Sequence, residues 1–341
     1  MAMPDGAGQR PTIYDVASLA GVSKSLVSLV LQGSSRVSEP RRAAVLAAIA
    51  ELGYRPSRAA TMLASHRTKN VEVVIDDYRN LSFVGLLVGL RSELASHGYH
   101  LTVTDRALNA TPGGLSAPMG VGTGLSTNLD GLIIAAEPDD ALLVGWTGPT
   151  VIAGWRATLP SGADLVANDD ELGGRMAVDH LLHLGHRRIG HLTGASGPAA
   201  HRRVGFVDRM LSAGLQPSVS DDLGGTAEED GYRTAADLLD ENPDITAIFA
   251  ANDTMALGAL AAIRARGRNV PADISLIGYD NSPLAQSRYL EITSIDDRSE
   301  LVGAAAGKAL LARFEDPALE PQRTLLEPTL VVRATTAPAA D

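Results

Sequence analysis

The sequence contains no cysteine, and this absence excludes disulfides, thiol nucleophiles and thiolate metal ligands. It fits the reducing cytoplasm, where disulfides are rare. Residues 1–11 are polar and glycine-rich and lack the apolar segment of a signal peptide, so we expect a cytoplasmic protein. No apolar run reaches the roughly 20 residues that a membrane helix needs. The best candidate, 141–155, is interrupted by Gly145, Gly148 and Pro149 and is predicted to be a buried strand with its approach.

The sequence also lacks common catalytic and nucleotide-binding motifs: it has no G-x-S-x-G, H-E-x-x-H or P-loop. The run GVGTG at 120–124 suggests a dinucleotide loop, but it opens no clear helix and has no acidic partner. His180, His183 and His186 are spaced three apart, which on a helix turns the outer two about 120° away from each other. A favourable position near a helix C-terminus explains them better than a metal does. We therefore predict no catalytic residue, no cofactor and no metal site.

The charge that is present is unevenly distributed. The 341 residues are 45% hydrophobic and 20% charged, which is typical of globular proteins, and the length suggests two or three domains. Residues 1–67 contain eight Lys/Arg and four Asp/Glu, a net charge of +4. Because the whole chain carries −11, the remainder must carry −15. A basic head on an acidic body indicates that only the head binds a polyanion.

The head has the pattern of three short helices. The T-x-x-D sequence at 12–15 is typical of a capping box, and Ser23 is suited to cap a second helix after a turn at Gly21. A third helix begins after Ser38 and ends at Gly53. The residues expected to face inward are Val16, Ala17 and Ala20 in the first helix and Val27, Val30 and Leu31 in the second. This pattern fits a helix-turn-helix unit, although an ordinary small helical bundle would also satisfy it.

The segment TIYDVASLAGVSKSLVSLVLQGSSRVSEPRRAAVLAAIAELGYRPSRAATMLAS resembles the headpiece of the LacI/GalR family of repressors without a gap from Thr12 to about Arg67. The resemblance implies that Lys24 and Ser25 contact base edges. Leu29 stands where many members carry a polar or basic base-contacting residue; leucine can touch only a thymine methyl group. The phosphate contacts implied are Thr12, Tyr14, Ser23, Ser28 and Gln32, and such contacts fix register without specifying sequence.

Residues 56–64 match the family's hinge helix, which is too short to be stable alone. The resemblance implies that it becomes ordered on operator DNA beside the same segment of a second subunit. Leu63 would then insert between base pairs in the minor groove, although it could instead pack against the larger domain. Arg58 is expected near a phosphate or the minor groove.

Beyond residue 70, short apolar runs alternate with helical stretches. Strands are predicted at 71–75, 101–104, 132–135, 151–153, 189–192, 245–250 and 275–278, and helices at 83–96, 172–184, 205–213, 230–239, 254–266 and 299–314. This alternation predicts doubly wound parallel sheets, which bind ligands at the carboxyl ends of their strands. Residues 107–129 contain no charged residue and many helix breakers, so they form either a loop or a poor helix.

LGHRRIGHLTG, AIFAANDTMALGALAAIRARG, VPADISLIGYDN and LEPTLVVRATT resemble the effector domain of the same family. The resemblance implies an α/β chain with a small all-α helix-turn-helix headpiece and a two-lobed periplasmic-binding-protein-like domain. The expected boundaries are 10–56 for the headpiece, 57–66 for the hinge helix, 70–167 with 297–326 for the first lobe, and 168–296 with 327–337 for the second. The dimer interface should involve 83–96.

Arg202, Asn252 and Asp280 stand where the family binds hydroxyl-rich ligands, and each can form directional hydrogen bonds to hydroxyls. Asp280 could instead cap a turn, and Asn252 could cap the following helix. Asp76, Phe83 and Trp155 are expected to line the same cleft. Thr226 replaces an aromatic residue common in relatives that bind sugars or purines, and Gly154 replaces an aspartate of some relatives. These two departures put a simple hexose in doubt.

Together these features predict a homodimeric repressor. It would bind a pseudo-palindromic double-stranded operator in the cytoplasm, associated with the nucleoid and not with a membrane, and a small polar effector such as a sugar would control its operator affinity. A tetramer would need a further assembly segment, and the tail after residue 332 shows no heptad pattern. A solute-binding protein is disfavoured by the basic head, and an enzyme by the missing catalytic constellation.

Overall fold

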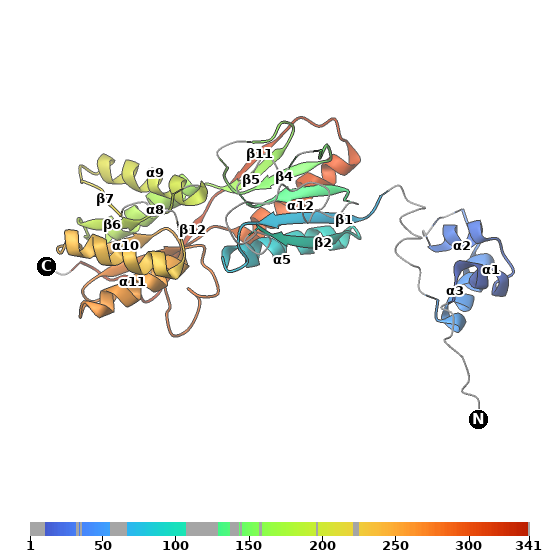
Figure 1. The fold of residues 1–341 in the computed structure, drawn as a ribbon, viewed down its shortest axis with the longest axis horizontal. Coiled ribbons are helices and arrows are strands. Elements are labelled where there is room, and N and C mark those ends of the chain that lie inside the picture. Colours follow the sequence, from blue (N-terminus) through green and yellow to red (C-terminus); the bar gives the residue numbers. More distant parts are fainter. Residues whose placement is uncertain are drawn as a thin grey trace, which may run out of the picture. The chain divides into compact units, whose positions relative to one another are not determined.

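A computed structural model describes residues 11–31, 34, 36–54, 67–106, 129–136, 143, 145–156, 159–195, 197–220 and 225–339. The chain divides into two compact units, Met1–Thr68 and Lys69–Asp341, which are considered separately (Figure 1). The predicted hinge residues, including Arg58 and Leu63, lie outside the described residues, as do Gln32 and nearly all of 107–129.

The smaller unit contains three helices: α1 (Ile13–Leu19), α2 (Lys24–Leu31) and α3 (Glu39–Leu52). Gly21 has a φ of 65°, a left-handed conformation that glycine adopts without strain and that turns the chain between α1 and α2. The helices enclose a small core of Val16, Ala17, Val27, Val30, Val37, Val45, Ala48 and Tyr54. The predicted helices are therefore confirmed, but the inward position of Leu31 is wrong. Leu31 is 38% exposed, whereas Leu26, one turn before Val30, packs against the core.

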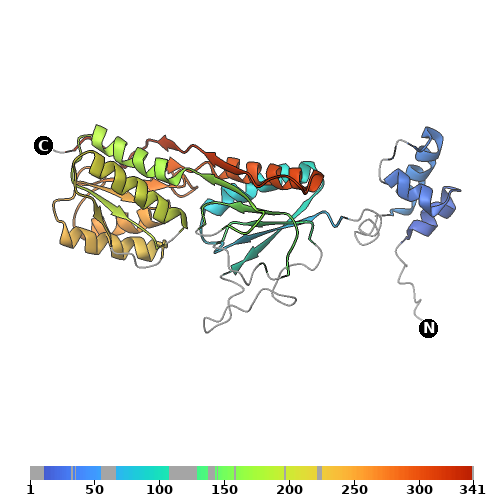
Figure 2. The same ribbon diagram turned by 90° about the horizontal axis from the view of Figure 1, so that it is seen from above.

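The larger unit contains two six-stranded sheets, each in its own lobe (Figure 2). The first has the order β11-β5-β4-β3-β1-β2 and is entirely parallel; the second has the order β12-β10-β9-β8-β6-β7 and is parallel except for β12, which runs antiparallel to β10. The first sheet comprises β1 (Asn70–Ile75), β2 (His100–Asp105), β3 (Gly131–Ile134), β4 (Thr150–Ala153), β5 (Asp164–Asn168) and β11 (Arg323–Leu326). The second comprises β6 (Ile189–Leu192), β7 (Ser218–Val219), β8 (Ala247–Ala250), β9 (Ser275–Tyr279), β10 (Thr293–Asp296) and β12 (Thr329–Val331).

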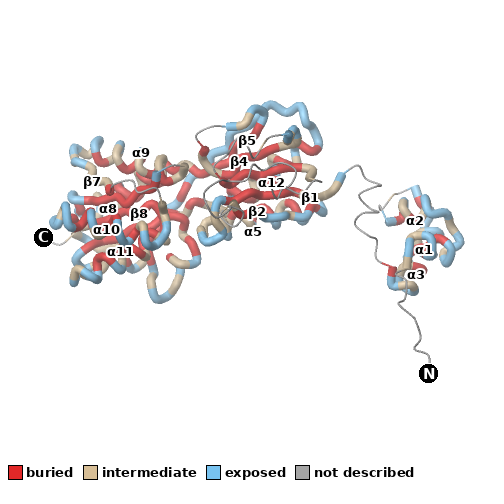
Figure 3. The backbone as a smooth tube through the Cα atoms, in the orientation of Figure 1, coloured by how far each residue is buried: buried red, intermediate tan, exposed pale blue. Residues whose placement is uncertain are grey.

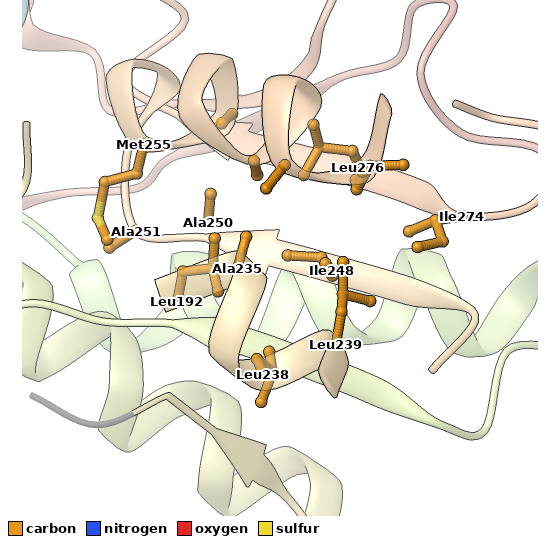
Figure 4. Close-up of a cluster of buried hydrophobic side chains, with 14 of the residues drawn as sticks. Leu192, Ala235, Leu238, Leu239, Ile248, Ala250, Ala251, Met255, Ile274 and Leu276 are labelled. Carbon is orange, nitrogen blue, oxygen red and sulfur yellow. The ribbon is translucent and has the colours of Figure 1, made fainter. Parts of the chain in front are cut away.

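Apolar strands form the centre of each lobe, and helices cover them (Figure 3). In the first lobe, α5 (Ser82–Ser96) and α12 (Ser299–Glu315) pack on one face of the sheet. In the second lobe, α8 (Asp170–His183) and α9 (Gly197–Ser212) pack on one face, and α10 (Glu228–Glu241) and α11 (Asp253–Ala265) on the other. Figure 4 shows the latter contact, in which Leu238 and Leu239 of α10 and Met255 of α11 join Ile248 and Leu276 of the strands.

The chain passes between the lobes at three places: from β5 to α8, from β10 to α12, and from β11 to β12. The carboxyl ends of strands from both sheets lie at the cavity between the lobes, where open parallel sheets bind ligands. Three chain segments thus connect the second lobe to the first, which allows the lobes to change orientation without separating.

All the predicted strands and helices of the body occur, and except at the start of one helix their ends are displaced by at most two residues. One boundary matters for function: α9 begins at Gly197 and not at 205, so Arg202 lies on a helix. Five strands are not among those predicted: β7 and β12 have only two and three residues, and β5, β10 and β11 have a polar residue at one or both ends. Among the described residues no single helix is long and apolar enough to span a membrane; α1 and α2 meet that criterion only as a pair bent by 104°.

Candidate DNA-contacting face and ligand cavity

The predicted DNA contacts that can be placed lie on α1 and α2 or at the N-termini of these helices. Tyr14, Ser23, Lys24, Ser25 and Leu29 are exposed, and Ser28 is half-buried. Lys24 Nζ lies 3.4 Å from the Tyr14 hydroxyl and 5.1 Å from the centre of its ring, so these two side chains approach each other across α1 and α2.

Two of the predicted phosphate contacts are also helix caps. The Ser23 hydroxyl accepts a hydrogen bond from Leu26 N at 3.3 Å at the start of α2. Thr12 donates both its backbone N–H and its hydroxyl to Asp15 Oδ2, each at 2.7 Å. These bonds hold the pKa of Asp15 below its ordinary value. The N-termini of α1 and α2 therefore have a fixed geometry, which suits a surface that must contact a phosphate backbone in register.

The larger unit contains a cavity of about 300 Å³ between its two lobes. Both walls are built largely from residues at the carboxyl ends of strands, as expected for open parallel sheets. Six of the seven predicted effector residues line it: Asp76, Phe83, Arg202, Thr226, Asn252 and Asp280.

Arg202 is the central cation of the second-lobe wall. Its Nε donates to Asp170 Oδ1 at 2.7 Å and its Nη1 to the Ala251 carbonyl at 2.6 Å. Nη1 also lies 3.2 Å from Asp280 Oδ1, and the guanidinium stacks 3.6 Å from the centre of the Tyr279 ring. Although burial opposes its charge, the two aspartates raise the pKa of Arg202. The guanidinium is thus charged and rigidly oriented.

Asp280 follows β9 and adopts a φ of 92°, a left-handed conformation that costs a non-glycine residue about 1–3 kcal/mol. Its N–H donates to the Ile295 carbonyl at 2.8 Å, which ties it to β10. Such strain is typical of functional positions. The interpretation as a simple turn cap is not supported, because the carboxylate lines the cavity and faces Arg202.

Asn252 both caps a helix and lines the cavity. Its Oδ1 accepts from Met255 N at 2.7 Å at the start of α11, and its Nδ2 donates to the Thr226 carbonyl at 3.1 Å. Asn252 can therefore cap the helix and bind a ligand at the same time, because its amide has a second N–H that neither of these bonds uses.

Trp155 does not line the cavity, contrary to expectation. Its Nε1 donates to the Asn168 carbonyl at 2.9 Å, and its ring stacks on His201 of α9 with centroids 4.6 Å apart. Trp155 follows β4, so this stack joins the first lobe to the second. The indole is held beside the cavity as a contact between lobes.

Several cavity residues were missed: Asn80, Ser82, Arg156, Asn168, Asp297 and Ser299. Arg156, Asn168 and Asp297 stand at or just beyond the carboxyl ends of β4, β5 and β10. Because β5 and β10 are not among the predicted strands, the sequence does not indicate that Asn168 and Asp297 stand at the ends of strands. Among the described residues no group of three His, Asp or Glu is arranged to hold a metal. His180 and His186 instead contact Thr336 and Ala337 near the C-terminus at 3.0 Å.

A three-helix headpiece of the helix-turn-helix type, followed along the chain by a two-lobed domain with an internal polar cavity, is typical of ligand-responsive DNA-binding regulators. Residues 12–57 match the model of bacterial regulatory proteins of the lacI family, and residues 178–336 match a periplasmic binding protein-like domain. The chain is 34% identical to the HTH-type transcriptional regulator CelR of Thermobifida fusca over 95% of its length and 98% of that protein. It therefore belongs to the lacI family of bacterial regulatory proteins.

Solved structures agree with this assignment. A complex of transcriptional regulator CelR with cellobiose is 31% identical, with a TM-score of 0.68, and the match covers 96% of this chain and all of that one. The lac repressor dimer bound to operator and the anti-inducer ONPF is 29% identical, with a TM-score of 0.81 and the same coverage. The LacI-type headpiece and two-lobed fold expected from sequence are thus confirmed.

Proposed function

We propose that this protein is a transcriptional repressor that binds a pseudo-palindromic operator as a homodimer and changes its operator affinity when a small polar molecule enters the cavity. The observation that carries the proposal is the cavity itself: buried Arg202, Asp280 and Asn252 converge there from three different elements of the second lobe, opposite residues of the first. A molecule that contacts both lobes stabilises one relative orientation of them, which is the requirement for an allosteric switch.

The effector that fits this wall is rich in hydroxyl groups. Arg202 and Asp280 are fixed in orientation, and a buried polar group that is left unpaired is costly, so ligands without matching donors and acceptors are rejected. A sugar or a related polar metabolite satisfies this condition, and the related CelR forms a complex with cellobiose. Thr226 and Gly154 leave the particular molecule open.

The headpiece, proposed as residues 10–56, would place α2 in the major groove, with Lys24 and Ser25 at the base edges. The hinge, 57–66, would transmit the lobe orientation to the DNA, with Leu63 inserted in the minor groove. The lobes are proposed to comprise 70–167 with 297–326 and 168–296 with 327–337. Because coupling is reciprocal, operator DNA must change ligand affinity by the same factor as ligand changes operator affinity.

We propose binding and not catalysis as the activity, and the cytoplasmic nucleoid as its location. The relatives identified are transcriptional regulators. The cavity has one arginine tied to two aspartates and no pairing of a nucleophile with a base that would suggest acyl or phosphoryl transfer among the described residues. A solute-binding protein would share the two lobes but not the headpiece.

The direct test is selection of binding sites for the full chain from a random duplex library, followed by gel shifts at several salt concentrations. We expect a two-fold symmetric sequence whose affinity falls steeply with salt, because phosphate contacts release counterions. The selected operator then allows a screen for small molecules that alter binding. Enrichment of no sequence above background would refute the proposal, while the Lys24→Ala variant provides the control for dependence on the headpiece.

A further inference from the structure

The cavity wall at the carboxyl ends of β9 and β10 holds more carboxylates than cations. Asp280 and Asp297 line it and are each only 8% exposed, and Asp170 lies beneath them, fully buried. Among the described residues Arg202 is the cation that contacts this group, and it is already engaged with Asp170, Asp280 and the Ala251 carbonyl. An excess of buried negative charge next to a cavity is unfavourable unless a proton or a ligand compensates it.

The same wall also lacks hydrogen-bond donors. Asp280 Oδ1 is enclosed and lies 3.2 Å from Arg202 Nη1, where it forms an ion pair but no hydrogen bond to a described group, and no described group donates to Asp280 Oδ2. Asp297 Oδ1 accepts from Ser299 N at 2.9 Å, and no described group donates to its Oδ2. The wall therefore presents carboxylate oxygens that a ligand with several donors would satisfy.

Without a ligand these carboxylates hold protons more tightly than usual. Burial raises the pKa of Asp280, and burial together with the charge of Asp280 raises the pKa of Asp297 well above its ordinary value. Burial and the charge of Asp280 likewise raise the pKa of Asp253, behind the wall on α11, to about 7. The remaining charged groups around them are Asp170 of α8 and Arg202 of α9, and Asp76 and Arg156 line the cavity from the first lobe.

A second hollow of about 870 Å³ adjoins the first and shares Asp76, Asn80, Phe83, Thr226 and Asn252 with it. It is lined by Asp77, Glu228, Glu229 and Asp230, with Arg79 as its described cation. Clefts lined by charge of one sign raise the local concentration of ligands of the opposite sign. Asp77 pairs with Arg79 and Asp230 with Arg233, which leaves Glu228 and Glu229 without an ion pair among the described residues. This adjoining hollow thus favours a cation, independently of the buried pair.

We propose that the effector is a hydroxyl-rich molecule with a positively charged amino group, such as an amino sugar, whose ammonium binds between Asp280 and Asp297. The inference rests on the proposed function of this cavity as the effector site. An ammonium supplies three N–H donors to the open carboxylate oxygens, and the neighbouring hydroxyls bond to Arg202 and Asn252. A neutral sugar would leave the excess charge uncompensated and would require a proton on one of the two carboxyls.

The test is calorimetry on the full chain with sets of ligands that differ only at one carbon. D-glucosamine, D-glucose and N-acetyl-D-glucosamine form one set, and the galactose and mannose series provide two others. We expect at least one ammonium member to bind on the order of tenfold or more tightly than its neutral counterparts. The Asp297→Asn variant should lose this preference. Asp179→Asn, which removes a negative charge from the exposed face of α8, should keep it.

The pH dependence gives an independent sign. An ammonium favours the ionised pair, so binding should release protons and should strengthen as pH rises through the raised pKa values of Asp280 and Asp297. Proton uptake, or failure of every ammonium member to bind more tightly than its neutral counterparts, would overturn the inference. Gel shifts on the selected operator separate the two proposals. A neutral sugar that binds and alters operator affinity leaves only the regulatory function intact, whereas an amino sugar that binds without altering it leaves only the ligand assignment intact.

Discussion

His191 shows how a single buried residue makes the stability of the second lobe depend on pH. Its ring is fully buried between Phe206 and Phe249, with centroids 4.9 and 4.7 Å away, and its Nδ1 donates to the Phe249 carbonyl at 2.9 Å. Burial lowers the pKa of His191 to about 3. The folded protein therefore keeps the imidazole neutral, while the unfolded chain takes up a proton below about pH 6.5.

This difference predicts that His191 destabilises the fold as pH falls from about 6.5 to about 3, at about 1.4 kcal/mol per pH unit. The raised pKa of Asp253 acts in the opposite sense, since its contribution is largest at low pH and is lost as pH rises towards about 7. Urea denaturation of wild type and of His191→Gln gives the difference in their free energies of unfolding, in which the contribution of Asp253 cancels because both proteins contain it. The stability of wild type relative to the variant should fall by about 3 kcal/mol between pH 6.5 and pH 4. A constant difference would mean that His191 is not held neutral.

At the scale of elements, helices of the second lobe approach each other too closely for side chains at the contact. A Cβ on Gly205 of α9 would lie 2.0 Å from the Glu171 carbonyl oxygen of α8, and one on Gly174 of α8 would lie 2.3 Å from the Arg202 carbonyl oxygen. These backbone contacts fix the separation of the two helices that carry Asp170 and Arg202. The geometry of the ion pair in the cavity wall thus depends on glycines that never touch a ligand.

Gly205→Ala should therefore separate α8 from α9 and lower the free energy of unfolding by about 1–3 kcal/mol. Ligand affinity should fall as well, because Arg202 moves relative to Asp170. Val204→Ala on the same helix is the control: this side chain is 51% exposed, and its loss should change stability by no more than about 0.5 kcal/mol. Equal stability of the two variants would show that the helices can separate at no cost.

The headpiece is the other element whose surface can be tested. Lys24 is exposed at the start of α2 and held near Tyr14. If it contacts a guanine, Lys24→Ala should cost about 1–3 kcal/mol and relax specificity at one operator position, whereas Arg58→Ala should weaken all sequences alike and reduce the salt dependence. Repeating the site selection with each variant distinguishes the two. A uniform loss of affinity in Lys24→Ala would assign it to the phosphate backbone.

At the scale of the whole molecule, the lobes communicate through a few contacts near the crossings. Asn168, at the end of β5, donates to the Tyr279 hydroxyl of the second lobe at 2.9 Å, and Tyr279 in turn stacks with Arg202. The stack of Trp155 on His201 is a second such contact. A ligand that binds Arg202 and the first-lobe wall therefore acts on the same residues that set the orientation of the lobes.

The proposed hinge would carry this orientation to the DNA, and Leu63 tests that role. Unstacking a base step costs a few kcal/mol, which an apolar side chain in the gap and the contacts of a bent duplex recover. Leu63→Ala should therefore lose specific affinity far more than non-specific affinity, which depends on phosphates, and should respond less to effector. Circularly permuted operator fragments measure the bend in a gel. A variant that bends DNA and answers the ligand like wild type would exclude the hinge as the coupling element.

Much of this architecture follows from the order of residues alone. The helical spacing of apolar residues and the capping residues predict the headpiece helices, and the alternation of apolar and helical stretches predicts parallel α/β sheets. These signals depend only on residues that are neighbours along the chain. Arg202, Asp280 and Asn252 are identified by the resemblance of the segments around them to the LacI/GalR family. The polar cavity residues at the ends of β5 and β10 could not be identified, because these short strands are recognisable only when paired in the sheet. Only the tertiary structure brought Asp297 next to Asp280 and turned Trp155 away from the cavity towards His201, because such placements depend on contacts between segments distant in sequence.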